Sequence, residues 1–366
     1  MKKVLYVYRT PRKAVYENWK NGKGPDSLLF GANHLEKMGY QVNFFDSAYS
    51  PLNFFHPFLY PLEHSIINVT KMGFKLDQAL WLLPRLNSYD VIVGTGDSAG
   101  LPLLALKYLG LLKRPIIFMT SGLAGAIKGR ENTCVGKFYK KILPAADIFT
   151  SYAQIEIDFF EKEMGIKKGK IKYMPLATDY AYFSQKSKSK RNIICAVGTE
   201  LGRDYKTLFE AVMDLPVRVE VACHPDNIKG LTIPSNVKIH LNIPVQEVLK
   251  IYQRSIISIV PCVERFRSSG QMVVLESAAA GLPIIASEIQ GITSAFAFGD
   301  KKHLLFTKPQ DPKDLRGKIE ILLANKNLRE KIAQNASTIA KQQYTTYHLA
   351  KRLAELIFAR KNNVDY

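Results

Sequence analysis

Short apolar runs alternate with amphipathic stretches along the first half of the chain. The runs are typical of buried strands, and the stretches between them, such as Ser27–Met38 and Leu101–Leu109, have apolar positions at helical spacing. The predicted strands of this half are Val4–Tyr8, Val42–Phe45, Val91–Val93, Ile116–Met119 and Ile148–Thr150. Strands that alternate with helices form parallel sheets covered on both faces. The pattern therefore predicts an α/β fold of the doubly wound type.

The alternation begins again after residues 184–191, which are polar and carry several lysines. Such a segment repels itself and stays solvated, so we expect a linker there. The elements predicted beyond it are strands Asn192–Val197, Arg218–Ala222, Val237–Leu241, Ile256–Val260 and Pro283–Ala286, and helices Tyr205–Met213, Val245–Gln253, Gln271–Ala280, Lys313–Ala324, Leu328–Gln343 and His348–Lys361. We expect a Rossmann-like domain over residues 1–183, a second over 192–345, and a closing helix with a tail over 346–366.

The composition is that of a globular protein with a large basic excess. Hydrophobic residues make up 47% of the chain and charged residues 23%, which excludes a disordered or fibrous protein. The net charge of +19 favours an anionic partner such as a nucleotide phosphate, a nucleic acid or an anionic membrane. Because no basic stripe carries interleaved stacking aromatics, we do not expect a nucleic-acid partner.

The cysteines and histidines argue against a metal centre. The four cysteines form no C-x-x-C pair, the seven histidines show no metal-binding spacing, and no Asp-x-Asp occurs.

Cysteines without pairing patterns indicate a reducing compartment, so we expect a cytoplasmic protein. No stretch reaches the roughly 18 apolar residues that a spanning helix needs, so membrane contact would be peripheral, at the inner face of the membrane.

The most informative segment runs from Pro261 to Ser287 and reads PCVERFRSSGQMVVLESAAAGLPIIAS. Its strand ends in a polar, glycine-bearing loop that opens a helix. The N–H groups of residues 270–273 and the positive end of the helix dipole would favour an anion, best a diphosphate. Glu276 lies almost two turns into the helix, where its carboxylate can accept hydrogen bonds from a ribose diol. Taken alone, the segment fits an ordinary buried helix with a solvated glutamate equally well.

Two further segments extend this observation: Met174–Phe183 reads MPLATDYAYF, and Val197–Leu208 reads VGTELGRDYKTL. In chain order, the three segments resemble the domain crossing, the donor-phosphate loop and the donor-site signature of retaining GT-B glycosyltransferases of family 4, the glycosyl transferases group 1. The resemblance implies a GT-B fold in which two Rossmann-like domains face a cleft and a C-terminal helix crosses back. It implies transfer of a sugar from a nucleoside diphosphate sugar to an acceptor hydroxyl, with retention and without a metal or other cofactor.

The resemblance also assigns residues. Arg203 and Glu276 are the expected catalytic residues. The expected donor-binding residues are Gly198, Thr199, Arg203, Ser268, Ser269, Gly270, Gln271, Met272, Val273 and Glu276. The expected acceptor side, for a carbohydrate or lipid-linked acceptor, is Gly22, Gly24, Thr120, Ser121 and Gly122. The turn at Gly22 and Gly24 is equally typical of a flexible surface turn.

Two departures from the family pattern change the expected site. Thr199 stands where the family has its first phosphate-binding arginine, whereas Arg203 aligns with its lysine and keeps a cation that can bind phosphate. Counting back from Glu276 puts Ser268 where the first of the family's paired glutamates should stand. Glu264 fills that role if the residues after it loop out. We favour Ser268 and keep Glu264 as the alternative.

Two stretches of the first domain allow a membrane-facing surface. Phe54–Leu62 combines four aromatics with two prolines in a predicted loop, and Asn132–Ala146 places an apolar helical stripe opposite Lys137, Lys140 and Lys141. A buried stripe with a solvated basic face is the simpler interpretation. The sharper one is an interfacial surface for anionic lipid and a lipid-linked acceptor.

Two other functions stay open on the same fold. The missing first glutamate and the large positive charge are compatible with a catalytically inactive nucleotide-binding protein. A nucleotide-sugar epimerase would need clustered acid and base groups, which the sequence does not show.

Overall fold

The computed structural model describes residues 1–45, 56–187, 191–200 and 202–359. The chain forms two compact units. Unit 1 comprises Met1–Asn21, Asp26–Pro175 and the residues from Tyr347 onward, and unit 2 comprises Gly22–Pro25 and Leu176–Thr346.

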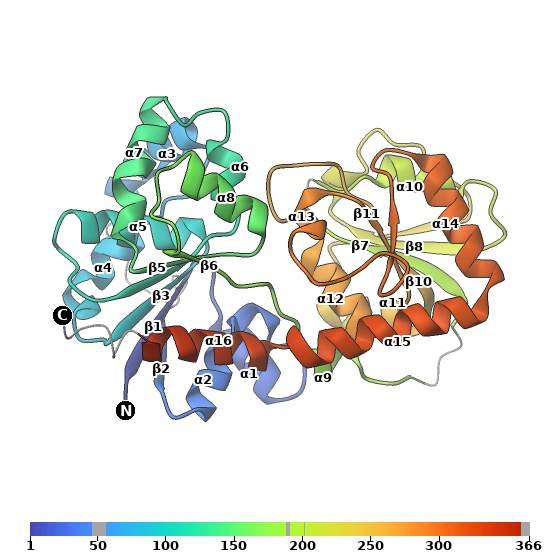
Figure 1. Cartoon of the computed structure of the whole chain (residues 1–366), viewed down its shortest axis with the longest axis horizontal. Coiled ribbons are helices and arrows are strands. Elements are labelled where there is room, and N and C mark those ends of the chain that lie inside the picture. The colour runs from blue at the N-terminus through green and yellow to red at the C-terminus, as the bar shows by residue number, and fades with distance from the viewer. Residues whose placement is uncertain (46–55, 188–190, 201, 360–366) are drawn as a thin grey trace. The chain divides into compact units, whose positions relative to one another are not determined.

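Unit 1 is built on a parallel sheet with the strand order β2-β1-β3-β4-β5-β6 (Figure 1). Its strands are β1 Lys3–Tyr8, β2 Gln41–Phe45, β3 Val91–Thr95, β4 Ile116–Met119, β5 Ile148–Ser151 and β6 Ile171–Tyr173. Its helices are α1 Lys13–Lys20, α2 Ala32–Lys37, α3 His56–Thr70, α4 Leu76–Leu86, α5 Asp97–Tyr108, α6 Leu123–Ile127, α7 Cys134–Ile142, α8 Gln154–Lys162 and α16 Thr346–Ala359. Strands β3 and β4 are buried throughout, as their continuous apolar runs predicted. Strand β6 was not predicted, because two of its three residues are exposed and form no apolar run.

The predicted helix Ser27–Met38 is interrupted. A 3₁₀ turn, Ser27–Leu29, is followed by two residues with positive φ, Phe30 at 51° and Gly31 at 80°, before α2 begins. A Cβ atom on Gly31 would lie 3.0 Å from the backbone of Ala350 in α16. The break therefore lets α16 approach this turn closely, and a contact of that kind leaves no trace in helical spacing.

A second prediction corrected by the structure concerns the aromatic stretch Phe54–Leu62. Residues 56–62 are not a loop but the first two turns of α3. Phe54 and Phe55 lie outside the described residues. Pro57 stands in the first turn of α3, where a missing N–H breaks no helical hydrogen bond, whereas Pro61 lies inside the helix and leaves one such bond unmade.

Unit 2 repeats the architecture with the strand order β12-β11-β10-β7-β8-β9, again all parallel. Its strands are β7 Ile193–Val197, β8 Arg218–Cys223, β9 Val237–Leu241, β10 Ser255–Val260, β11 Ile284–Ser287 and β12 Leu305–Thr307. Its helices are α9 Tyr180–Phe183, α10 Tyr205–Val212, α11 Val245–Arg254, α12 Gln271–Ala279, α13 Gln290–Thr293, α14 Pro312–Ala324 and α15 Lys326–Gln343. Ile194, Leu208 and Ile259 are fully buried in its core. The two doubly wound sheets confirm the predicted α/β fold class.

The boundary between the units lies before the predicted linker. Residues 176–183, expected in the first domain, belong to unit 2. The ring of Phe183 lies edge-on to Tyr252 of α11 at 6.1 Å, and the hydroxyls of Tyr180 and Ser337 are 2.7 Å apart. These contacts between residues distant in sequence attach the segment to unit 2. Of the predicted linker, residues 188–190 lie outside the described residues.

The last helix, α16, belongs to unit 1 from Tyr347 onward. Leu349, Leu353 and Ile357 are buried, as their helical spacing predicted. Nζ of Lys2 donates a hydrogen bond of 3.0 Å to the carbonyl of Ile357, which links the residue before the first strand to the last helix. The predicted tail beyond residue 359 lies outside the described residues.

Candidate functional site

Two loops of unit 2 come together at the carboxyl ends of neighbouring strands. Residues 198–200 and 202–204 follow β7, and residues 261–270 follow β10. The N–H of Asp204 donates to the carbonyl of Pro261, and the N–H of Val263 donates to the carbonyl of Gly202, each at 3.0 Å. The predicted phosphate loop and the predicted helix start are therefore side by side, at the edge of the sheet where ligands of open α/β folds bind.

Helix α12 is preceded by a glycine whose backbone adopts the left-handed conformation. Gly270 caps it with φ at 76°, and a Cβ atom there would lie 3.0 Å from Cγ1 of Val260 and 3.1 Å from Sγ of Cys262. Only glycine suits both the conformation and the space. Because glycine supplies no side-chain cap, the first N–H groups of α12 can serve an anion.

The side chains at the start of α12 pack into unit 2. Gln271 and Val273 are buried, and Met272 is half-buried. Nε2 of Gln271 donates a hydrogen bond of 2.7 Å to the carbonyl of Gly291, which ties α12 to α13. For these three residues, the backbone is therefore the part that can contact a donor.

Arg203 lies buried in the loop between β7 and α10, with only 3% of its side chain exposed. Nη1 is 3.5 Å from Sγ of Cys262, and Nη2 is 3.8 Å from a carboxylate oxygen of Glu200. Nε has no hydrogen-bond partner among the residues that the structure describes. A Cβ atom on Gly198 would lie 2.1 Å from this Nε, so glycine at 198 makes room for the guanidinium. A buried guanidinium with an unused N–H suits a phosphate oxygen.

Glu200 joins this group, and the sequence analysis missed it. Its Oε2 accepts hydrogen bonds from Oγ of Ser269 at 2.9 Å and from the N–H of Gly270 at 3.4 Å. Thr199, next to it, is exposed. The sequence shows only that Glu200 lies in the predicted phosphate loop. That its carboxylate reaches α12 is visible only in the folded chain.

The two candidates for the missing glutamate lie in different surroundings. Ser268 is buried and precedes Ser269, which contacts Glu200. Glu264 is exposed, and its carboxylate accepts a hydrogen bond of 3.0 Å from the N–H of Gln290, the first residue of α13. Glu264 therefore supports the start of α13.

Glu276 is half-buried on α12, and its Oε2 accepts a hydrogen bond of 3.0 Å from the hydroxyl of Tyr252. Burial raises the pKa of Glu276 to about 7, while the Tyr252 hydrogen bond and the charge of Arg203 act in the lowering direction. A carboxyl group that titrates near neutral pH is typical of functional sites. Tyr252 is a second residue that the sequence did not single out, because its place on the apolar face of α11 predicts only a core residue.

The predicted acceptor residues fall into two groups. Thr120 and Ser121 follow β4, and both their hydroxyls donate to the buried carboxylate of Asp97, at 2.7 and 3.0 Å. Gly122, the next residue, caps α6. The other group, Gly22 and Gly24, belongs to unit 2, where the carbonyl of the residue between them accepts a hydrogen bond of 2.7 Å from Gln246. The two groups therefore lie in different units.

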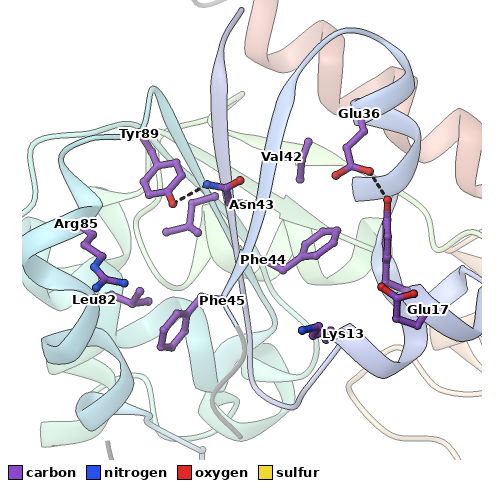
Figure 2. Close-up of a pocket in the computed structure, with 12 residues that line it drawn as sticks. Lys13, Glu17, Glu36, Val42, Asn43, Phe44, Phe45, Leu82, Arg85 and Tyr89 are labelled. Atoms are coloured by element: carbon purple, nitrogen blue, oxygen red, sulfur yellow. Dashed lines mark hydrogen bonds between the residues drawn. The ribbon is translucent and has the colours of Figure 1, made fainter. Parts of the chain in front are cut away.

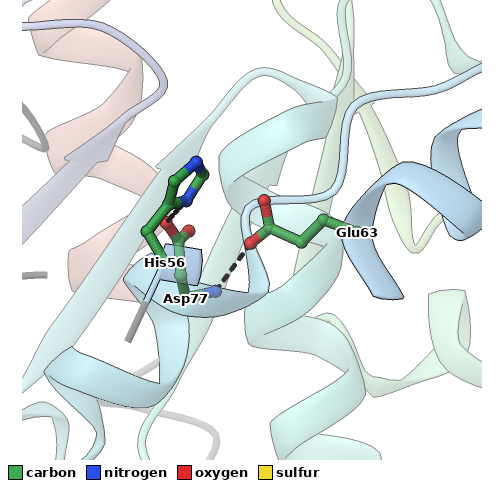
Figure 3. Close-up of side chains that lie close together, drawn as sticks. All are labelled: His56, Glu63 and Asp77. Carbon is green, nitrogen blue, oxygen red and sulfur yellow. Dashed lines mark hydrogen bonds and ion pairs between the residues drawn. The ribbon is translucent and has the colours of Figure 1, made fainter. Parts of the chain in front are cut away.

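One group of three potential metal ligands occurs among the described residues, in unit 1 (Figure 3). Nδ1 of His56 lies 2.9 Å from Oδ2 of Asp77, and Oε1 of Glu63 accepts a hydrogen bond of 2.8 Å from the N–H of Asp77. Burial raises the pKa of Glu63; for Asp77 burial acts in the same direction, but hydrogen bonds from Glu63 and His56 lower its pKa overall. Glu63 caps the first turn of α4, so these contacts also connect α3 to α4. Sequence spacing missed the group because its members come from two helices.

Unit 1 contains a polar pocket and an apolar pocket. One, of about 660 Å³, lies beside the edge strand β2 and brings Lys13, Glu36 and Arg85 together with aromatic side chains (Figure 2). The other, of about 780 Å³, is lined mainly by apolar side chains of α3 and α4: Phe58, Leu59, Leu80, Trp81 and Pro84. The first suits a polar molecule and the second a hydrocarbon group.

The sequence of unit 2 matches a family model. Residues 220–338 match the model described as Glycosyl transferases group 1, and the match contains all of α12 with Glu276. This segment is a glycosyl transferases group 1 domain. A curated relative, the D-inositol 3-phosphate glycosyltransferase of Corynebacterium urealyticum, is 29% identical over 162 residues. The aligned region covers 41% of this chain and 37% of the relative, so it spans well under half of the relative's length.

Solved structures share the architecture of the whole chain. HepE of Anabaena, in complex with UDP and glucose, matches with a TM-score of 0.70 and 13% identity over 98% of this chain and 100% of its own. A Listeria monocytogenes protein assigned as a UDP-N-acetylglucosamine 2-epimerase matches with a TM-score of 0.60 and 15% identity over 100% and 98% of the chains. The group 1 domain is thus part of a two-domain GT-B fold. Within the described residues, no helix has the length and apolarity that crossing a bilayer requires.

Proposed function

We propose that this protein is a glycosyltransferase that moves a sugar from a nucleoside diphosphate sugar to an acceptor hydroxyl. The observation that carries the proposal is the meeting of two loops at the carboxyl ends of β7 and β10, where Arg203 bridges to Cys262 and Glu200 contacts Gly270, the cap of α12. Glu276 lies on the same helix, within the segment that matches the glycosyl transferases group 1 family. The complexes of HepE with UDP and glucose favour a UDP-sugar as the first donor to test.

The proposed reaction relies on electrostatic stabilisation of the leaving group. As the bond between the sugar and the diphosphate breaks, negative charge develops on the diphosphate. Arg203 and the first N–H groups of α12 are fixed donors that stabilise this charge without reorganising. These donors would then neutralise the charge on the diphosphate without a metal ion. Glu276 accepts hydrogen bonds from the ribose diol, and the resemblance to family 4 favours retention at the anomeric carbon.

For the acceptor, we propose a lipid-linked or membrane-proximal molecule. Phe58, Leu62 and Val69 stand at helical spacing on one face of α3 and are 75%, 50% and 53% exposed. The single acidic residue of α3, Glu63, is buried. The apolar pocket of about 780 Å³ opens beside Phe58. An exposed apolar helix face next to an apolar pocket fits an amphiphile at a bilayer surface.

The segment that leads into α7 contacts the end of α3, and α7 itself contacts a residue that follows α3. The guanidinium of Arg130 donates to the carbonyls of Val69 and Thr70 at the end of α3, and the rings of Phe74 and Phe138 are 6.4 Å apart. The structure buries Val135, Tyr139 and Ile142 of α7, as the simpler interpretation of this stripe predicted. Lys137 and Lys141 are exposed and Lys140 is half-buried. Their charge complements anionic lipid, so the proposal now rests on α3 together with these lysines.

A donor panel tests the proposed function. We would incubate the protein with UDP-, GDP- and ADP-sugars and a cell-membrane lipid extract as acceptor source, and follow release of the nucleoside diphosphate and labelled product. Donor-dependent product formation supports a transferase. Conversion of the donor sugar to an epimer supports the epimerase instead, and tight nucleotide binding with neither product supports the inactive binding protein.

A further inference from the structure

Glu200 places its carboxylate among the groups proposed to bind the donor diphosphate. Its Oε2 accepts hydrogen bonds from Oγ of Ser269 at 2.9 Å and from the N–H of Gly270, the cap of α12, at 3.4 Å. The same oxygen lies 3.8 Å from Nη2 of Arg203. Carboxylate and phosphate oxygens are both anionic acceptors and use the same donors. One side chain of the protein thus contacts a hydroxyl, a helix start and a cation that an incoming phosphate would also contact.

Glu200 is a poor hydrogen-bond partner for the guanidinium of Arg203. The arginine side chain is 3% exposed, yet its distance to Glu200 exceeds hydrogen-bond length. Its Nε is buried and has no hydrogen-bond partner among the described residues. A buried guanidinium is stabilised most by an acceptor that engages two of its N–H groups. A phosphate group offers such oxygens, whereas the Glu200 carboxylate approaches one nitrogen from 3.8 Å.

The Glu200 side chain can leave without disturbing the loop. It is 42% exposed, so rotation toward solvent breaks little packing. The backbone at this position is held separately: the carbonyl of Glu200 accepts hydrogen bonds from Nδ2 of Asn227 at 2.9 Å and from the N–H of Arg203 at 3.2 Å. The carboxylate is thus a movable group on an anchored backbone.

We propose that Glu200 is an internal competitor of the donor diphosphate. Its carboxylate holds Ser269 and the start of α12 when no donor is bound, and the diphosphate displaces it. This inference rests on the proposed function for the identity of the ligand. It makes Glu200 a specificity-determining residue. An anion must displace the carboxylate before it can bind Arg203 and the start of α12, and only an anion with enough charge does so.

The test compares two probes on three proteins. Pyrophosphate and UDP are titrated calorimetrically into the wild type, Glu200→Gln and Glu210→Gln. Glu200→Gln removes the charge and keeps the size. Glu210, an exposed residue of α10, provides the matched control, because its substitution changes the net charge equally and its carboxylate pairs with Lys206 at 3.9 Å. We expect Glu200→Gln to bind both probes about three- to tenfold more tightly, as for loss of a charge competing at a helix start, and Glu210→Gln to match the wild type.

The inference is overturned if Glu200→Gln binds pyrophosphate and UDP with wild-type or lower affinity, since lower affinity would make Glu200 a direct ligand of the donor. A second variant, Glu200→Ala, also removes the hydrogen-bond acceptor and should show at least the same gain. The outcomes separate the two proposals. If the gain appears but no nucleotide sugar is turned over, the proposed function fails and the competition stands. If sugar is transferred without a gain in affinity, the competition fails and the function stands.

Discussion

The hydroxyl of Tyr252 donates a hydrogen bond of 3.0 Å to Oε2 of Glu276. Tyr252 is fully buried in α11, and burial raises the pKa of its hydroxyl well above the usual value, so it remains a donor across the physiological pH range. Burial raises the pKa of the Glu276 carboxyl group to about 7. The pair therefore fixes the position of a carboxyl group whose charge changes within the working range of an enzyme.

This pair predicts a pH dependence of donor binding. The ionised carboxylate can accept two hydrogen bonds from a ribose diol, so the donor KM should fall as pH rises through about 7. Glu276→Gln should weaken donor binding and abolish this pH dependence. Tyr252→Phe removes a hydrogen bond that lowers the pKa of Glu276, so the midpoint should move to higher pH.

The measurement is the donor KM, with kcat, from about pH 6 to about pH 9. Tyr252 acts through Glu276, so its substitution should change KM more than kcat. A midpoint that stays in place in Tyr252→Phe would show that the tyrosine serves packing alone. If Glu276→Gln unfolds while donor affinity in the remaining folded protein is unchanged, Glu276 is structural.

The close approach of Gly198 to Arg203 predicts a second effect. A Cβ atom at position 198 would lie 2.1 Å from Nε of Arg203, so Gly198→Ala must displace the guanidinium. Donor affinity should fall by about tenfold, or about 1.4 kcal/mol. Gly281→Ala is the matched control, because Gly281 also has positive φ but a Cβ atom there meets nothing within 4 Å. Titration of UDP into both variants checks this, and equal affinities would remove the steric argument.

The proposed leaving-group stabilisation needs no metal, so transfer should persist in excess EDTA. In the proposed site, Arg203 and the start of α12 would supply the positive field at the diphosphate. The assay compares initial rates with and without the chelator. Complete loss of transfer, restored by magnesium or manganese, would contradict the prediction. A change in thermal stability without a change in rate would instead concern the His56, Glu63 and Asp77 group of unit 1.

The proposed membrane surface predicts binding to anionic vesicles that salt weakens only in part. Clustered lysines contribute about 1 kcal/mol each near an anionic bilayer, and buried apolar side chains add a part that salt does not screen. Replacing Lys137, Lys140 and Lys141 with glutamate should reduce cosedimentation strongly, and Phe58→Asp should remove the salt-resistant part. The control replaces Lys229, Lys313 and Lys331 of unit 2 with glutamate, which changes the net charge equally. Negligible binding of all variants and of the wild type would refute the surface.

The arrangement of the fold could be predicted because parallel sheets leave a strong pattern. Strands such as β4 are apolar at every position, and the intervening helices carry periodic apolar faces. The break at Gly31 could not be predicted, because it depends on the approach of Ala350 from the other end of the chain. The boundary between the units lies before residue 176 and not at the predicted linker for the same reason: contacts with Tyr252 and Ser337 attach residues 176–183 to unit 2.

The parts of the candidate site that lie on one continuous segment could be predicted. The parts that depend on contacts between two segments could not. The glycine cap at Gly270 and the carboxylate of Glu276 lie on one continuous motif with recognisable spacing. Glu200 and Tyr252 contribute through contacts across the fold. Their residue types, a loop glutamate and a tyrosine on an apolar face, fit ordinary surface and core positions equally well.

The most direct test of the central claim is the titration of UDP into the wild type and Arg203→Ala, with Lys206→Ala as the control. Lys206 lies three residues further along, is 73% exposed, and carries the same charge, which it pairs with Glu210 of α10 at 3.9 Å. If Arg203 binds the diphosphate, Arg203→Ala should lose most UDP affinity and about 2 to 4 kcal/mol of transition-state stabilisation in transfer, while Lys206→Ala stays close to the wild type. Equal UDP affinity and equal transfer kinetics in all three folded proteins would contradict the account.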